Sequence, residues 1–107
     1  MKALFDRVSI RCSRITTHAY STSFSLGIRC LERDLRDPIY SIYGFVRFAD
    51  EIVDTFHDFD KKRLLERFKE ETYQSIREGI SLNPILNSFQ GTVNRSNIEN
   101  ALIEQYF

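Results

Sequence analysis

Four polar side chains recur along one apolar segment, and together they could bind an anion through a metal ion. They are Tyr43, Arg47, Asp50 and Asp54, at spacings i, i+4, i+7 and i+11. At about 100° per residue, a helix would place them on one stripe roughly 60° wide. Mg²⁺ binds carboxylate and phosphate oxygens and would remove the repulsion between aspartates one turn apart. An arginine in register adds a planar donor fork for the same oxygens.

The surroundings of this stripe are unusually apolar. Most other residues from Ile39 to Phe56 are apolar, and a helix that is apolar on most sides is usually buried. Buried charges cost free energy unless they are paired or bound to metal. We therefore expect the stripe to face inward and to serve a function. The simpler alternative is that Arg47 neutralises Asp50 while Asp54 reaches solvent, and the sequence leaves both interpretations open.

A hydroxyl-rich segment precedes this region. Ser21 and Ser23 flank Thr22 just before Phe24, where a helix is expected to start. Hydroxyls and free backbone N–H groups at a helix N-terminus can bind an anion. Serine and threonine are also preferred N-caps, so capping alone can explain one of these hydroxyls.

The elements that must position these residues are all predicted to be helices. Only four glycines and two prolines interrupt 107 residues, and no stretch has a convincing strand pattern. The expected helices cover 5–18, a short segment after the hydroxyls, 38–56, 61–78 and 84–93, followed by a last helix opened by a capping box at 96–99. In the first of these helices, Phe5, Val8, Cys12 and Ile15 form the expected apolar face. The expected N-caps are Asp37, Asp60 and Asn83, and Gly79 is expected to end the helix 61–78.

Composition narrows the class of protein. Fifteen basic residues balance fifteen acidic ones, which gives no reason to expect nucleic acid as a partner. Cys12 and Cys30 lack metal-ligand spacing, and the chain shows neither a secretion signal nor a membrane-spanning segment. We therefore expect a reducing, cytoplasmic location. Peripheral membrane association stays open, because Lys61–Arg63 could touch anionic lipid or simply form a solvated helix start.

The segments Tyr20–Phe24 and Tyr43–Asp54, taken together, resemble the squalene/phytoene synthase family, most closely its bacterial phytoene synthase branch. The resemblance covers essentially the whole chain, 1–107, as the N-terminal part of an all-α isoprenoid-synthase helical bundle. It implies a head-to-head condensation of two prenyl diphosphates, with geranylgeranyl diphosphate as substrate in the phytoene branch. The reaction would pass through a cyclopropyl diphosphate intermediate to phytoene and release diphosphate.

The resemblance also implies roles for individual residues. It makes Asp50 and Asp54 ligands of Mg²⁺, for which Mn²⁺ could substitute, and it places Tyr43 and Arg47 beside them in the catalytic group. The implied substrate-binding residues are Ser21, Ser23 and Arg47 for the diphosphate, Phe24 and Tyr43 for the cavity wall, and Ile28 for the prenyl tail. NADPH would be required only by a squalene-forming enzyme.

One departure from the family pattern limits the expected activity. No aspartate follows Asp60, so the family's second aspartate-rich motif is absent from this chain. We expect 1–107 to be a partial domain that carries one wall of the site and has no turnover alone. Its oligomeric state is not indicated by the sequence.

Several alternatives remain beside phytoene synthesis. They are a squalene or dehydrosqualene synthase using farnesyl diphosphate, and a non-catalytic helical binding module derived from the family. A helical pyrophosphohydrolase is disfavoured because its sites need several glutamates on neighbouring helices. A farnesyl-diphosphate-type elongase is disfavoured because Glu51 stands where its Asp-Asp-x-x-Asp motif needs aspartate.

Overall fold

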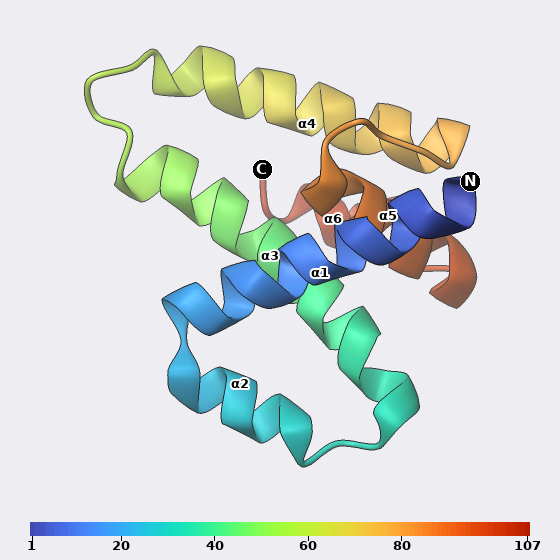
Figure 1. Cartoon of the computed structure of the whole chain (residues 1–107). Coiled ribbons are helices and arrows are strands. Elements are labelled where there is room, and N and C mark those ends of the chain that lie inside the picture. Colours follow the sequence, from blue (N-terminus) through green and yellow to red (C-terminus); the bar gives the residue numbers. More distant parts are fainter.

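The computed structural model describes all 107 residues and contains six helices and no strand, which confirms the all-α prediction (Figure 1). The helices are α1 (Lys2–Tyr20), α2 (Thr22–Arg29), α3 (Arg33–Asp54), α4 (Lys61–Glu78), α5 (Pro84–Ser96) and α6 (Asn100–Glu104).

Helix α3 is the central element of the molecule. It packs against α1, α2, α4 and α5, and α1 crosses it while α4 runs along the other side (Figure 1). Three phenylalanines from different helices form the centre of the core. The ring of Phe45 in α3 lies 3.9 Å from that of Phe89 in α5 and 5.5 Å from that of Phe68 in α4, centroid to centroid. This core fixes α3 and therefore the polar stripe that it carries.

The predicted buried face of the first helix is wrong. Helix α1 buries Ser9, Ser13 and Thr17, whereas Val8 and Ile15 are exposed, Ile15 by 67%. The reason is close packing between helices. The Ser13 hydroxyl donates to the Ser88 hydroxyl at 2.9 Å, and a Cβ atom at Gly44 would lie only 3.2 Å from Ser13 Oγ. Only small side chains fit between helices that approach so closely.

The predicted start of the central helix is also wrong. Helix α3 begins at Arg33, and Pro38 lies inside it. A proline this near the N-terminus removes only one hydrogen bond of the helix ladder. Asp37 does not cap the helix, because its carboxylate accepts from Arg14 Nη2 at 3.2 Å. The Arg36 guanidinium donates to the Leu31 and Arg29 carbonyls, both at 3.1 Å, and so ties the end of α2 to the early turns of α3.

The termini of the next two helices confirm most of the local signals. Asp60 caps α4 by accepting from the Arg63 N–H at 3.1 Å, and Gly79 ends α4 with a left-handed φ of 73°. Asn83 caps α5 through its side-chain oxygen, and α5 continues three residues beyond its predicted end.

The predicted capping box at 96–99 is wrong. Helix α5 includes Ser96 and ends at Asn97, whose φ of 54° is left-handed. Helix α6 starts only at Asn100. Asparagine tolerates the left-handed conformation and can end a helix as glycine does. The same residues therefore close one helix here and do not open the next.

No helix of the chain is both long enough and apolar enough to cross a bilayer. The two cysteines are free thiols, with Cys30 exposed and Cys12 partly buried.

Candidate active site

The junction between α1 and α2 brings the Phe24 ring against the central helix α3. Ser21 is the single residue between these helices, and its hydroxyl oxygen accepts from the Phe24 N–H at 3.1 Å. This cap turns the chain sharply. As a result, the Phe24 ring meets Tyr43 of α3 edge-on, with centroids 5.0 Å apart and planes at 66°. The structure thus joins the hydroxyl segment to the start of the polar stripe.

Arg47 lies between an anion and an aromatic ring. Its Nη2 donates to Glu51 Oε1 at 2.8 Å, and its guanidinium carbon lies 4.9 Å from the centre of the Tyr20 ring. The side chain is 25% exposed. The alternative in which Arg47 neutralises Asp50 is therefore wrong about the partner, since the ion pair is made one residue further along the helix.

One donor of Arg47 has no partner. Its Nε is buried and makes no hydrogen bond. A buried donor left unpaired costs about 1–3 kcal/mol, so this guanidinium would gain from an acceptor oxygen placed beside it. Glu51 therefore satisfies only part of the donor capacity of Arg47.

The two aspartates do not face inward, and the expectation of a buried stripe is wrong for them. Asp50 and Asp54 are exposed and form no ion pair within the chain. Val53 and Phe56 beside them are also exposed, because the last turns of α3 extend beyond the helices that cover its middle. No group of three acidic, histidine or cysteine side chains gathers closely enough to hold a metal ion.

The remaining predicted substrate-binding residues lie in different environments. Ser23 is exposed and makes no side-chain hydrogen bond, whereas Ile28 is buried, with 1% of its surface accessible. Phe24 is exposed beside Tyr43. The structure therefore gathers Phe24, Tyr43 and Arg47 and places Ile28 in the protein interior.

Sequence analysis missed two residues that shape this site. Burial raises the pKa of the Tyr20 hydroxyl, and the nearby Glu51 carboxylate raises it further. Glu51 could have been found from its i+4 spacing to Arg47, which is the usual spacing of a helical ion pair. Tyr20 comes from another helix and has no such signal in the sequence.

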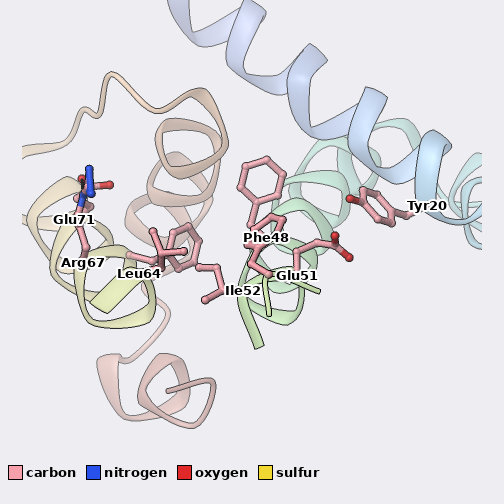
Figure 2. A pocket seen from close by; sticks show the side chains of 9 residues that line it. Tyr20, Phe48, Glu51, Ile52, Leu64, Arg67 and Glu71 are labelled. Atoms are coloured by element: carbon pink, nitrogen blue, oxygen red, sulfur yellow. Dashed lines mark ion pairs between the residues drawn. The ribbon is translucent and has the colours of Figure 1, made fainter. Parts of the chain in front are cut away.

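An apolar cavity of about 380 Å³ borders these side chains (Figure 2). It lies between α3 and α4, with Phe48 and Ile52 on one side and Leu64 and Phe68 on the other. Figure 2 shows the oxygens of Tyr20 and Glu51 turned toward each other at one edge. The cavity is mainly apolar, and its charged lining residues are Glu51, Arg67 and Glu71, so it suits the hydrocarbon part of a ligand.

The six helices, with no strand, give the all-α architecture of the isoprenoid-synthase fold. The family model described as squalene/phytoene synthase matches residues 17–107. The chain therefore belongs to the squalene/phytoene synthase family, a family of prenyltransferase-type enzymes of isoprenoid biosynthesis. Comparisons with curated proteins and with solved structures give no match.

Proposed function

We propose that this chain forms the diphosphate-binding wall, with the first aspartate pair, of a phytoene-synthase-like prenyltransferase. The reaction is the head-to-head condensation of two prenyl diphosphates, geranylgeranyl diphosphate in the first instance, through a cyclopropyl diphosphate to phytoene. The observation that carries the proposal is the unpartnered, buried Nε of Arg47. It lies on the helix that also bears two exposed, unpaired carboxylates, in a chain that belongs to this family.

The donor set fits magnesium. Asp50 and Asp54 lie one turn apart, are exposed and have no partner within the chain. Mg²⁺ takes one or two carboxylates from a protein and completes its octahedron with water and substrate phosphate. When bound, Mg²⁺ or Mn²⁺ would neutralise charge that develops on the leaving diphosphate.

The chain's own residues would bind and orient the diphosphate. Arg47 donates Nε–H to a diphosphate oxygen, and its charge stabilises the leaving group as the carbon–oxygen bond breaks. Glu51 holds the guanidinium in place through Nη2, while the Tyr20 ring covers its face. The Ser21 oxygen accepts the capping N–H, so its own O–H is free to donate to the anion. Ser23 is free to donate as well.

The aromatic pair would protect the hydrocarbon part of the substrate. Loss of diphosphate leaves an allylic carbocation that must be kept from water. Aromatic faces attract cations. Phe24 packs edge-on against Tyr43, which lies one turn before Arg47 on α3. Ile28 lies one turn after Phe24 in α2 and backs this wall from the interior.

The proposal is tested by metal-dependent diphosphate binding. We expect the chain to bind inorganic pyrophosphate more tightly with Mg²⁺ than without it, and we expect Asp50→Asn and Asp54→Asn to abolish that difference. Asp58→Asn is the matched control, because Asp58 is an exposed aspartate in the connection after α3. Calorimetry measures the pyrophosphate affinity of the unmodified chain, the two stripe variants and the control. Equal Mg²⁺ dependence in the control and the two stripe variants would contradict the proposal.

The absence of a second acidic wall makes a separate prediction about turnover. No aspartate follows Asp60, and no further metal-binding group is present. We expect no phytoene when the chain is incubated with geranylgeranyl diphosphate and Mg²⁺. Formation of phytoene would show that one wall suffices.

The same assay with farnesyl diphosphate, with and without NADPH, tests the alternative of a squalene or dehydrosqualene synthase. Pyrophosphate binding with no product from either substrate is also what a non-catalytic module derived from the family would show. The lack of a third metal ligand suits that module as well as it suits a partial domain.

A further inference from the structure

Four arginines surround one cavity far from the aspartate pair. The cavity has a volume of about 430 Å³ and is lined by Arg14, Arg29, Arg33 and Arg36 together with His18. It lies where α1, α2 and the start of α3 meet. Figure 1 shows α2 and the start of α3 on the opposite side of α1 from α4. Fourteen residues separate Arg36 from Asp50, or roughly 20 Å along the axis of α3. The cavity is therefore far from the aspartate pair, and it shares no lining residue with the proposed diphosphate wall.

The positive charge of this cavity is barely compensated. Its one carboxylate, Asp37, is already paired with Arg14 at 3.2 Å. Arg36 is held by two backbone carbonyls, which fix its charge in place and do not neutralise it. Arg29 and Arg33 are exposed and make no ion pair or side-chain hydrogen bond. Their donors are available to a ligand.

The distribution of charge along the chain points the same way. Residues 1–36 contain seven of the fifteen basic residues and three of the fifteen acidic ones, which leaves eight and twelve for the remainder. A chain without net charge thus divides into a positive N-terminal third and a negative remainder. The arginine cavity is built mainly by the positive third, so the local potential favours an anion there.

Helix geometry accounts for one of these arginines and not for another. A basic residue in the last turn of a helix is favoured by the helix dipole, which explains Arg29 at the end of α2. Arg33 occupies the first turn of α3, where the dipole makes positive charge unfavourable. The N-cap residue Glu32 makes no side-chain cap hydrogen bond to this end of α3. Asp34 already supplies one negative charge to this turn, and an anion in the cavity would add to it.

We propose that this arginine cavity binds a phosphate group through Arg29 and Arg33, with Arg14 and Arg36 completing its positive wall. Guanidinium groups suit a phosphate because their planar forks donate two parallel hydrogen bonds to its oxygens. The phosphate can belong to a soluble phosphate compound or to a lipid headgroup. The second source is supported by the exposed apolar side chains Val8 and Ile15 on α1, the helix that also supplies Arg14.

The test compares two double variants in phosphate binding without Mg²⁺. Inorganic phosphate is titrated by calorimetry into the unmodified chain, into Arg29→Ala/Arg33→Ala and into the control Lys62→Ala/Arg77→Ala. The control removes two exposed positive charges from α4. We expect the cavity variant to bind about tenfold more weakly or worse, because hydrogen bonds to charged groups are lost. We expect the control to bind as the unmodified chain does.

Two further experiments identify where the phosphate comes from and which site binds it. Vesicles of phosphatidylcholine with and without phosphatidylglycerol are sedimented with each protein, and loss of binding in the cavity variant alone identifies a lipid phosphate. Binding of inorganic phosphate without binding of vesicles identifies a soluble ligand. Arg63→Gln, at an exposed arginine of α4 that belongs to neither site, is expected to leave phosphate binding unchanged, and a loss there would overturn the proposal.

Circular dichroism is used to check that each variant is folded. The charge-preserving variant Arg29→Lys/Arg33→Lys is expected to regain part of the affinity. Equal weakening by the cavity variant and the α4 control would overturn the proposal, as would binding of neither phosphate nor vesicles.

Discussion

Arg47 is held by two contacts that leave its Nε without a partner. Glu51 accepts from Nη2 at 2.8 Å, and the Tyr20 ring lies 4.9 Å from the guanidinium carbon, while Nε has no partner. The carboxylate orients the guanidinium and at the same time opposes the approach of an anion. Substitution can separate orientation from repulsion. The hydrogen bond to Glu51 orients the guanidinium, whereas the negative charge of Glu51 repels an anion without contacting it.

Substituting the two members of this ion pair should change anion affinity in opposite directions. We expect Arg47→Gln to weaken pyrophosphate binding by about tenfold or more, since a charged donor is lost. We expect Glu51→Gln to strengthen it several-fold, because the amide still accepts from Arg47 without repelling the anion. Calorimetric titration at constant ionic strength measures both.

Glu70→Gln serves as the control for these titrations, because Glu70 is an exposed carboxylate on α4. It removes the same charge at a distance from Arg47 and should leave pyrophosphate affinity unchanged. If Glu51→Gln weakens binding instead, orientation of the guanidinium outweighs repulsion and the argument from charge is wrong.

At the scale of single elements, two glycines differ in what they do. Gly79 ends α4 with φ of 73°, a conformation that costs residues with a Cβ atom about 1–2 kcal/mol. Gly27 lies within α2, and a Cβ atom there would meet nothing within 4 Å. Glycine inside a helix destabilises it by about 0.5–1 kcal/mol relative to alanine.

Alanine at these positions should therefore have opposite effects on stability. We expect Gly79→Ala to lower the free energy of unfolding by about 1 kcal/mol and Gly27→Ala to raise it by up to about 1 kcal/mol. Urea denaturation followed by circular dichroism gives both values. Changes of the same sign would show that backbone conformation does not control these two sites.

Helix α6 is fastened to α4 by one carboxylate. Glu104 accepts from Lys69 Nζ at 2.5 Å and from the Tyr73 hydroxyl. The bond from Lys69, and next that from Tyr73, lowers the pKa of Glu104. Burial, supported by the Glu104 contact, raises the pKa of Tyr73 to about 12. This attachment holds a helix of only five residues against the core.

Because the pKa of Tyr73 is raised, the stability of the folded chain depends on pH in the alkaline range. Because the folded value of about 12 exceeds the ordinary value of 10.0, the contribution of protonated Tyr73 is complete below pH 10 and is lost as pH rises through 12. We expect Tyr73→Phe to be less stable at neutral pH and to lose less of its stability over this alkaline range. Thermal melts recorded across the range measure the difference.

Tyr106→Phe is the control for these melts, since Tyr106 is an exposed tyrosine of the same C-terminal region. It should follow the unmodified chain at every pH. All other titratable groups are shared by the three proteins, so the difference between the two variants reports Tyr73. Identical alkaline profiles for both variants would contradict the assignment.

At the scale of the whole molecule, much apolar surface is left uncovered. The outer face of α1 exposes Leu4, Val8 and Ile15, and the end of α3 exposes Val53 and Phe56. Apolar surface in contact with water favours association and binds hydrophobic dyes. The inner side of the molecule is well packed around Phe45 by comparison.

We therefore expect the isolated chain to bind a hydrophobic dye and to associate as its concentration rises. Ile15→Lys removes part of this surface without touching the buried face of α1, so it should reduce dye fluorescence and leave helix content unchanged. Fluorescence titration and light scattering measure the two effects. A soluble monomer with a sharp cooperative melt and no dye binding would contradict this expectation.

Local signals in the sequence correctly predict several features of this protein. Asp60, Gly79 and Asn83 mark helix termini that the structure confirms, and the same reading predicts an all-α fold. These signals work because capping and left-handed conformations involve groups within one turn of each other. The motif from Tyr20 to Asp54 likewise indicates the family that the comparison confirms.

The tertiary structure alone decides which faces are buried and which charges pair. Helix α1 turns Ser13 inward and Ile15 outward because α3 and α5 approach too closely for a large side chain. The Tyr20 ring comes to lie over Arg47 because the end of α1 packs against α3. The contacts that decide these features join residues far apart in the chain, so the local sequence carries no signal of them.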